Sequence, residues 1–306
     1  MIQVKDVTFA YDKKKPAIYQ DLNLEFQDND SIAILGFNGA GKSTLMKLLL
    51  GILHPTHGTI MVDGVNIHKK RIAAMYHIGV VWGQKPSLWW DISVKRSYDT
   101  LAKMYHLSDR EYKETLLYLD EHLQVSTFWH QPLRSLSLGQ RVKAEIIGAL
   151  LHRPSLLILD EPFIGLDFLT REKVINVLHD YREQYPCTLL LTSHHIDDVK
   201  ALCRHMTLID HGQVIYNGSI SKLMETFQYQ KEIIMTHTME TFRIQEEYQN
   251  LIDVMKLDEH TIKLMVKSEE IDHIALMKTL LKDNDIIDFK INGVSLESVI
   301  KTLIHA

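Results

Sequence analysis

Hydrophobic and polar positions divide the chain into predicted strands and helices. In residues 1–35, the segments IQVKDVTFAY and DLNLEFQ alternate between apolar and polar residues, which is typical of half-buried strands. The runs SIAILG, SLLILDEP and TLLLTSHH are almost uniformly apolar, and helical patterns separate them, for example over 93–130 and 170–184. Uniformly apolar strands that alternate with helices predict a parallel sheet covered on both faces.

The pattern changes after about residue 218. The segments TIKLMVKS and IIDFKI predict strands, and Ser295 is a candidate cap for a last helix. Ser268 would cap a helix whose buried face is Ile271, Ile274, Met277 and Leu281, and Thr170 would cap the helix at 170–184. We therefore expect two domains: an α/β domain over 1–218, with a helical subdomain at about 88–152, and a small α+β domain over 219–306.

Composition narrows the class of protein. Apolar residues make up 45% of the chain and charged residues 24%, as in ordinary folded soluble proteins. No uncharged apolar stretch approaches the ~20 residues of a membrane-spanning helix, and the N-terminus carries no signal-like apolar region. Cys187 and Cys203 are the only cysteines, which excludes a disulfide framework and favours a reducing compartment.

The distribution of charge argues against a nucleic-acid partner. Residues 219–306 carry 10 basic and 15 acidic side chains, whereas residues 1–218 carry 24 of each. Neither part has the basic excess of a nucleic-acid-binding domain, so we expect no nucleic acid as a partner.

The strongest chemical motif is the segment GFNGAGKS, Gly36 to Ser43, between a predicted strand and a predicted helix. It matches the phosphate-binding loop pattern, in which backbone N–H groups and the helix N-terminus surround phosphate oxygens. Lys42 would reach the β- and γ-phosphates, and the Ser43 hydroxyl would coordinate Mg²⁺. The expected nucleotide contacts are Gly36, Asn38, Gly39, Ala40, Gly41, Lys42, Ser43 and Thr44.

A second motif, LLILDEP, ends a buried strand in two carboxylates. Asp160 would hold Mg²⁺ directly or through water, and Glu161 could accept a proton from an attacking water. Together the two motifs predict a P-loop nucleotide hydrolase or transferase.

The stretch LSLGQ at 136–140 resembles the signature element of the ATP-binding subunits of ABC transporters. In that family this element begins a helix and binds the γ-phosphate of ATP held by a partner subunit, which assigns Ser137, Gly139 and Gln140 to nucleotide binding. Leu138 departs from the family pattern, which has glycine there. Read alone, LSLGQ is also compatible with an ordinary helix start.

Other elements of the same family occur in the expected order. Tyr11 fits the aromatic residue that stacks on adenine, with a strand aromatic packed in the core as the alternative. Gln84 fits the glutamine that contacts Mg²⁺ and the attacking water, with a surface amide as the alternative. His194 fits the histidine that contacts the γ-phosphate, with its neighbour His195 as the rival. The resemblance thus implies Glu161, His194, Gln84 and Lys42 as catalytic residues, Ser43, Gln84 and Asp160 as metal ligands, and ATP and Mg²⁺ as cofactors.

The resemblance also implies an assembly. The segments VVWGQKPSLWWD and LRSLSLGQR are most similar to ATPases paired with ABC-2 type membrane subunits, often exporters. The implied fold is an ABC ATPase core, and the implied partners are a separate permease subunit and a second copy of the chain, at the cytoplasmic face of the membrane. Trp89 and Trp90 would contact the permease if exposed, or belong to the core of the helical subdomain.

Two other functions are compatible with a P-loop. A soluble ABC ATPase that acts on ribosomes or nucleic acid is disfavoured because the chain has one set of motifs, no heptad insertion and a balanced charge over 1–218. A P-loop kinase is disfavoured by Glu161 next to Asp160 and by the LSLGQ element. The sequence does not identify the transported substrate.

Overall fold

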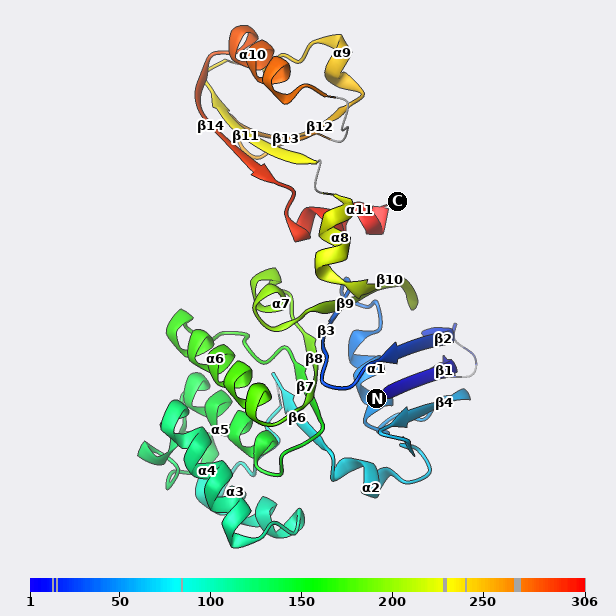
Figure 1. The fold of residues 1–306 in the computed structure, drawn as a ribbon, viewed down its shortest axis with the longest axis vertical. Helices are drawn as coiled ribbons and strands as arrows, with labels where there is room; N and C mark the ends of the chain where they lie inside the picture. Colours follow the sequence, from blue (N-terminus) through cyan, green and yellow to red (C-terminus); the bar gives the residue numbers. More distant parts are fainter. Residues whose placement is uncertain are drawn as a thin grey trace. The chain divides into compact units, whose positions relative to one another are not determined.

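The computed structural model describes residues 1–12, 14, 16–83, 85–227, 230–239, 241–266 and 271–305, with only the backbone of residue 305. The chain divides into two compact units, unit 1 (Met1–Gly218) and unit 2 (Ser219–Ala306), which Figure 1 traces along the sequence.

Unit 1 combines two sheets with a group of helices. One sheet has the strand order β2-β1-β4-β5, and the other has the order β10-β9-β3-β8-β7-β6. The elements are β1 (Ile2–Phe9), β2 (Tyr19–Phe26), β3 (Ser31–Leu35), α1 (Lys42–Leu49), β4 (His57–Val62), β5 (Val65–Asn66), α2 (Arg71–Met75), β6 (Ile78–Trp82), α3 (Val94–Met104), α4 (Asp109–Leu123), η1 (Val125–Thr127), η2 (Leu133–Ser135), α5 (Leu138–Leu150), β7 (Leu156–Asp160), α6 (Phe168–Gln184), β8 (Thr188–Thr192), α7 (Ile196–Leu202), β9 (His205–Asp210) and β10 (Gln213–Ser219).

The predicted α/β fold class is confirmed. The strands β9, β3, β8, β7 and β6 are parallel, whereas β1 pairs antiparallel with β2 and β4. β3, β7 and β8 are buried along almost their whole length, as their uniformly apolar sequences predict. Helix α1 packs against both sheets, and its buried residues Leu45, Leu48 and Leu49 join one hydrophobic core. The loop before α1 is therefore fixed against the central sheet.

Helix α6 begins earlier than the sequence indicates. Thr170 was the expected cap, but the helix starts at Phe168, and the side chain of Asp167 accepts a hydrogen bond from the backbone N–H of Thr170 at 2.9 Å. The aspartate is the better cap because its carboxylate also interacts favourably with the helix dipole.

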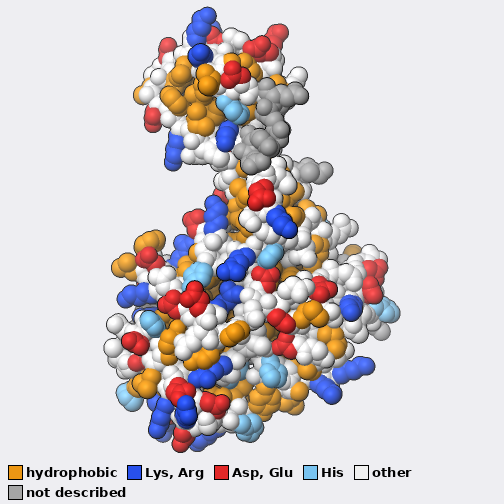
Figure 2. Space-filling view, viewed as in Figure 1, with side chains coloured by type: hydrophobic (Ala, Val, Ile, Leu, Met, Phe, Trp, Pro, Cys, Tyr) orange, Lys and Arg blue, Asp and Glu red, His pale blue; other side chains and the backbone are white. Residues whose placement is uncertain are grey.

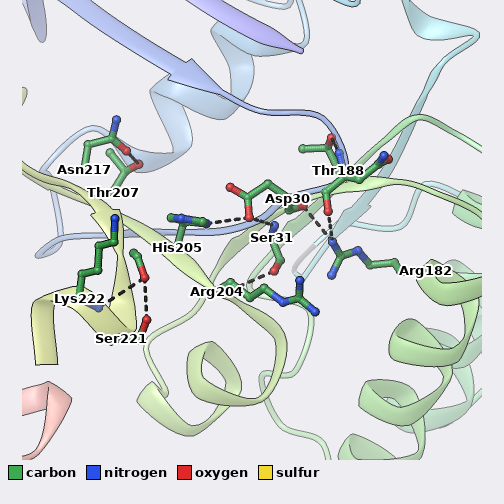
Figure 3. Close-up of polar contacts among 12 residues, drawn as sticks. Asp30, Ser31, Arg182, Thr188, Arg204, His205, Thr207, Asn217, Ser221 and Lys222 are labelled. Carbon is green, nitrogen blue, oxygen red and sulfur yellow. Dashed lines mark hydrogen bonds and ion pairs between the residues drawn. The ribbon is translucent and has the colours of Figure 1, made fainter. Parts of the chain in front are cut away.

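Polar contacts tie the amino ends of the central strands together, and Figure 3 shows them. The Asp30 carboxylate lies 2.8 Å from Nδ1 of His205, and the backbone N–H of Arg204 donates to Oγ of Ser31 at 3.1 Å. The Arg182 guanidinium, from the end of α6, donates to the Asp30 carbonyl at 3.0 Å. These bonds hold the strands together at their amino ends. Gly36, Asp160 and Thr192 lie at the opposite, carboxyl ends, which remain available for other contacts.

Unit 2 is a four-stranded antiparallel sheet of order β12-β13-β11-β14 with helices. Its buried core includes Ile233, Leu264, Leu276 and Leu280. Its elements are α8 (Ile220–Thr226), β11 (Lys231–His237), α9 (Glu246–Gln249), β12 (Ile252–Lys256), β13 (Thr261–Val266), α10 (His273–Asp283), β14 (Ile286–Gly293) and α11 (Leu296–His305).

The helix expected after Ser268 differs from the prediction. Residues 267–270, including Ser268, lie outside the described residues, and α10 begins at His273 with Asp272 as its cap. Ile271 and Met277 are buried as expected, whereas Ile274 and Leu281 are exposed. In the helix that begins at His273, the buried face differs from the expected one, and Leu276 and Leu280 face the core instead. Ser295 does cap the last helix: its Oγ accepts a hydrogen bond from the N–H of Ser298 at 3.2 Å.

Candidate functional site

A cavity of about 1040 Å³ opens at the carboxyl ends of β3, β7 and β8. Ligands of parallel α/β sheets commonly bind at this edge, where loops leave the strands. The cavity is lined by Tyr11, Ile18, Asn38, Gly39, Gly41, Lys42, Ser43, Thr44, Lys47, Ile52, Trp82, Gly83, Lys85, Pro86, Ser87, Asp160, Glu161, Ile164 and His194. It therefore brings together the phosphate-binding loop, the acidic pair and His194 from three separate parts of the sequence.

The phosphate-binding loop runs from β3 into α1. Gly41 has φ +111°, and a Cβ there would lie 2.5 Å from the Tyr19 hydroxyl, so only glycine fits. The ammonium of Lys42 donates to the carbonyls of Gly36 at 2.7 Å and Phe37 at 3.1 Å. Burial lowers the pKa of Lys42, while the nearby carboxylates raise it. The loop thus presents a buried cation beside the N-terminus of a helix, which is an arrangement suited to an anion.

Two predicted loop contacts do not line the cavity. Ala40 is buried under the loop with 4% of its surface exposed, and Gly36 contributes its carbonyl to Lys42. A Cβ at Gly36 would lie 2.1 Å from the carbonyl oxygen of Ile209, so this position is set by packing against β9.

Tyr11 faces the cavity instead of the core. It is 58% exposed, and its hydroxyl lies 3.1 Å from Oγ1 of Thr44 at the start of α1. Its ring meets Phe9 edge to face, with 5.0 Å between the centroids. The tyrosine is therefore held by contacts along one edge, and much of its surface remains open to the cavity.

The acidic pair is positioned by the neighbouring strand β8. Oγ1 of Thr192 donates a hydrogen bond to Oδ1 of Asp160 at 2.6 Å. The Thr192 Oγ1 also accepts a hydrogen bond from the backbone N–H of Glu161 at 3.0 Å. Glu161 has φ +53°, a strained backbone conformation for a non-glycine residue. Thr192 is fully buried and was not identified from the sequence, because its importance depends on the pairing of β7 with β8.

Glu161 and His194 form a close pair. Oε1 of Glu161 lies 3.2 Å from Nε2 of His194, and Oε2 accepts the backbone N–H of His194 at 3.2 Å. Burial raises the pKa of Glu161; His194 opposes this shift, and Asp160 adds to it. Within the described residues, the cavity lining includes His194 and does not include the rival His195.

The predicted metal ligands are hard oxygen donors. Ser43 and Asp160 both line the cavity, and hydroxyl and carboxylate oxygens are ligands that suit Mg²⁺. The residues present therefore fit a magnesium ion. The third predicted ligand, Gln84, lies outside the described residues.

Ser137, Gly139 and Gln140 lie away from the cavity lining within the described part of this chain. Ser137 and Gln140 form a reciprocal cap at the start of α5: the N–H of Gln140 donates to Oγ of Ser137 at 3.3 Å, and the N–H of Ser137 donates to Oε1 of Gln140 at 3.0 Å. Leu138 is accommodated because Gly165 has no side chain. A Cβ added at Gly165 would lie only 2.7 Å from a Cδ atom of Leu138. If this element binds a nucleotide, that nucleotide is therefore not the one in the cavity of the same chain.

The segment after residue 84 connects the cavity to the helical subdomain. The carboxylate of Glu145, on α5, accepts the backbone N–H groups of Ser87 at 2.9 Å and Leu88 at 3.2 Å. Leu88 is buried, whereas Trp89 and Trp90 are 40% and 44% exposed. The interpretation of both tryptophans as core residues is therefore wrong, because Leu88 takes the core position.

The sequence missed several lining residues. Trp82, Lys47, Ile52, Lys85 and Ile164 line the cavity without belonging to a motif. Their positions follow from loops that converge in the folded unit, and no local pattern distinguishes them from other lysines or apolar residues. Lys47 follows Ser43 by four residues, so the two lie on the same face of α1. This helical spacing is the one signal in the sequence that could have identified Lys47.

Comparisons with known proteins agree with this geometry. The family model described as "ABC transporter" matches residues 19–164. The chain is 31% identical over 226 residues to the Nod factor export ATP-binding protein I of Cupriavidus metallidurans, an alignment that covers 74% of this chain and 73% of that protein. It is 27% identical over 283 residues to the linearmycin resistance ATP-binding protein LnrL of Bacillus subtilis, covering 92% of this chain and 90% of LnrL.

A solved structure is similar as well. It is cbiO1 from Clostridium perfringens, described as part of the ABC transporter complex cbiONQ, with a TM-score of 0.63 and 26% identity over 74% of this chain and 94% of that one. Within the described residues, no helix has the length and hydrophobicity needed to span a membrane.

Proposed function

This chain belongs to the family of ABC transporter ATP-binding proteins, ATPases that drive transport through a separate membrane component, and we propose that its cavity binds ATP with Mg²⁺ and hydrolyses it. The observation that carries the proposal is the convergence of Lys42, Glu161 and His194 on one cavity at the carboxyl ends of three parallel strands. Phosphoryl transfer to water requires charge neutralisation, proton acceptance and orientation. Lys42, Glu161 and His194 supply these three in that order.

ATP binding rests on the loop and on Tyr11. The exposed ring of Tyr11 offers a stacking surface for adenine, and the N–H groups at Asn38, Gly39 and Gly41 surround the phosphates. When ATP binds, the Lys42 ammonium gives up its hydrogen bonds to the loop carbonyls and donates to phosphate oxygens instead. The new hydrogen bonds compensate the free-energy cost of breaking the old ones.

Hydrolysis rests on Glu161 and His194. Glu161 accepts the proton of the attacking water, and its raised pKa makes it a stronger base than an exposed glutamate. His194, 3.2 Å away, orients that carboxylate and reaches the γ-phosphate. Ser43, Asp160 and Gln84 would hold Mg²⁺, which would supply positive charge to neutralise the phosphates.

The position of the LSLGQ element supports a head-to-tail dimer of identical chains. Ser137 and Gly139 lie outside the cavity of their own chain, so they serve the γ-phosphate of a second copy. Phe168 and Leu169, just after the Gly165–Asp167 loop, are 72% and 67% exposed, which fits a surface that becomes covered when two copies close.

The exposed Trp89 and Trp90 support a contact with the membrane subunit. Tryptophan is enriched at the centres of protein interfaces, and Glu145 fixes the backbone just before these two residues. Such a contact supports a location at the cytoplasmic face of the membrane, bound to a permease. The similarity to a Nod factor export protein and to a linearmycin resistance protein favours export as the direction.

The test of hydrolysis is phosphate release by the purified chain with Mg²⁺ and ATP, compared with Lys42→Ala. We expect the variant to lose ATP binding and hydrolysis, whereas Lys113→Ala, on the exposed side of α4, retains both. Normal binding and turnover in Lys42→Ala would overturn the assignment.

The test of the membrane partner is recovery of a polytopic protein with the tagged chain from gently solubilised native membranes. The double change Trp89→Ala and Trp90→Ala should reduce recovery and leave soluble ATP hydrolysis intact. Leu117→Ala, which changes an apolar side chain on α4 that is 67% exposed, is the matched control. Recovery only of ribosomal or nucleic-acid partners contradicts the transporter assignment.

A further inference from the structure

The strand β14 forms one edge of the sheet in unit 2. It pairs with β11 on one side and is last in the strand order β12-β13-β11-β14. The five residues from 287 to 291 are all exposed, on both faces of the strand. An edge strand presents unpaired N–H and C=O groups, and proteins commonly protect such edges with short strands, proline, charged side chains, β-bulges or a covering helix. β14 carries two of these features, the charged pair Asp288 and Lys290 and a register shift at Ile287, and the charged pair is the one that a partner strand can match. Over its described residues, β14 has eight residues and no proline.

The side chains of β14 alternate from Asp288 to Gly293, and the register with β11 shifts at Ile287. Phe289 and Ile291 share one face, and they are 46% and 47% exposed. Phe289 is opposite Met235 and Ile291 is opposite Ile233 on β11, so this face continues the side that carries the core. Figure 2 shows a cluster of hydrophobic side chains on unit 2, over the region where Figure 1 draws α10 and β14. Two large apolar side chains, Phe289 and Ile291, are thus left exposed on this face at the edge of the sheet.

The other face of β14 carries one acidic and one basic side chain, Asp288 and Lys290, on either side of Phe289. The order acidic, aromatic, basic in Asp288, Phe289 and Lys290 is complementary to itself when a second copy of the strand runs in the opposite direction. If Phe289 is opposite the same residue of another copy, Asp288 is opposite Lys290 at two places. Opposite charges and apolar pairs across strands stabilise a sheet, whereas like charges destabilise it.

We propose that β14 pairs antiparallel with β14 of a second copy of this chain, in the register centred on Phe289. The pairing joins the two four-stranded sheets into one sheet of eight strands and keeps the core-bearing faces on the same side. It pairs the backbone groups of both edges and brings Phe289 and Ile291 of each copy into contact with the partner strand.

The opposite edge strand, β12, does not fit this arrangement. Centred on Val254, an antiparallel pairing that keeps the faces aligned places Asp253 opposite Met255 and Ile252 opposite Lys256. Neither pair is complementary in charge or polarity. Both edges are exposed, so the difference between them lies in the order of side chains.

This contact goes beyond the proposed function. Closure of two ATP-binding units requires nucleotide between them, whereas pairing of β14 requires none. The strand pairing therefore keeps two copies associated when ATP has been hydrolysed.

The test is sedimentation velocity of the full chain without nucleotide, over a concentration series. We expect a monomer–dimer equilibrium. Asp288→Lys alone and Lys290→Asp alone each create two like-charge contacts in the dimer and should raise its dissociation constant about tenfold. Lys256→Asp, on β12, is the matched control and should leave it unchanged.

Two rescues distinguish strand pairing from general stickiness. A one-to-one mixture of the two single variants restores opposite charges at both contacts, so a heterodimer should form with near wild-type affinity. The double variant Asp288→Lys with Lys290→Asp should restore the homodimer. A chain that stays monomeric without nucleotide, or associates with no response to these charges, overturns the proposal. ATP hydrolysis by the same variants is measured separately, since its failure would concern the cavity in unit 1.

Discussion

Glu161 in unit 1 is partly buried and Glu232 in unit 2 is buried, and the pKa values of the two carboxylates are perturbed in opposite directions. In unit 1, burial raises the pKa of Glu161 despite the nearby His194. In unit 2, burial alone would raise the pKa of Glu232, but hydrogen bonds from Lys263, Ser295 and Ser298 lower it to about 2. The number and charge of donors, and not burial by itself, separate these two cases.

The difference teaches how to distinguish a reactive carboxylate from a structural one. Glu232 is paired with the Lys263 ammonium at 2.8 Å and accepts the N–H and hydroxyl of Ser295 at 3.0 Å, so its lone pairs are occupied. Glu161 lies at an open cavity beside Asp160, with a histidine as its close partner. A base must have a lone pair available for substrate, and Glu161 meets that condition while Glu232 does not.

The largest expected effect comes from removing the base. Glu161→Gln should lower steady-state ATP hydrolysis by about 10²–10⁴-fold, because the amide accepts no proton at neutral pH. ATP binding should be preserved, and a dimer should accumulate with ATP. Phosphate release, nucleotide binding and size-exclusion chromatography measure the three properties. Turnover close to wild type would show that another group is the base.

The next effect concerns the structural carboxylate. Glu232→Ala leaves the Lys263 ammonium partly buried and unpaired, and we expect a loss of about 2–3 kcal/mol in the free energy of unfolding of unit 2. ATP hydrolysis should stay unchanged. Glu297→Ala is the matched control, because its pair with Lys301 is exposed and worth little. Urea denaturation measures both variants, and equal losses would contradict the comparison.

Acid should act on unit 2 through the same residue. The pKa of Glu232 is lower in the folded state than its ordinary value near 4.5, so its contribution is complete above pH 4.5 and is lost as the pH falls toward 2. The loss should be smaller than in Glu232→Ala, because the protonated side chain still accepts hydrogen bonds from serine. Urea denaturation of unit 2 at several pH values tests this, and the pH dependence should flatten in Glu232→Gln.

The smallest effect sharpens the role of the neighbouring strand. Thr192→Val removes the hydroxyl that positions Asp160 and Glu161 without adding volume, and we expect a decrease in kcat of about 5–10-fold, close to the loss of one hydrogen bond. Thr207→Val, which removes a buried hydroxyl that donates to Asn217, is the control and should leave kcat unchanged. If both variants lower kcat equally, the effect is one of general packing.

Local pattern was sufficient for most of the elements and for the motif residues that line the cavity. The uniformly apolar runs became the parallel strands β3, β7 and β8, and the GFNGAGKS loop lies between a strand and a helix as the motif requires. Both properties depend on neighbours in sequence: a period of hydrophobicity selects the element, and glycine at a fixed position permits a positive φ. The start of α10 was misjudged because Asp272 competes as a cap, and β11 and β12 were not identified.

What the tertiary structure alone decided is which side chains meet and which remain open. Thr192 matters through the register of β7 with β8, Tyr11 faces the cavity because Phe9 supports it from one edge, and Trp89 is exposed because Leu88 fills the core. The same holds for β14: its sequence alternates like any amphipathic strand, but only its place at the end of the sheet leaves its edge open. Periodicity records which face of an element is apolar, while burial depends on what long-range packing lays against that face.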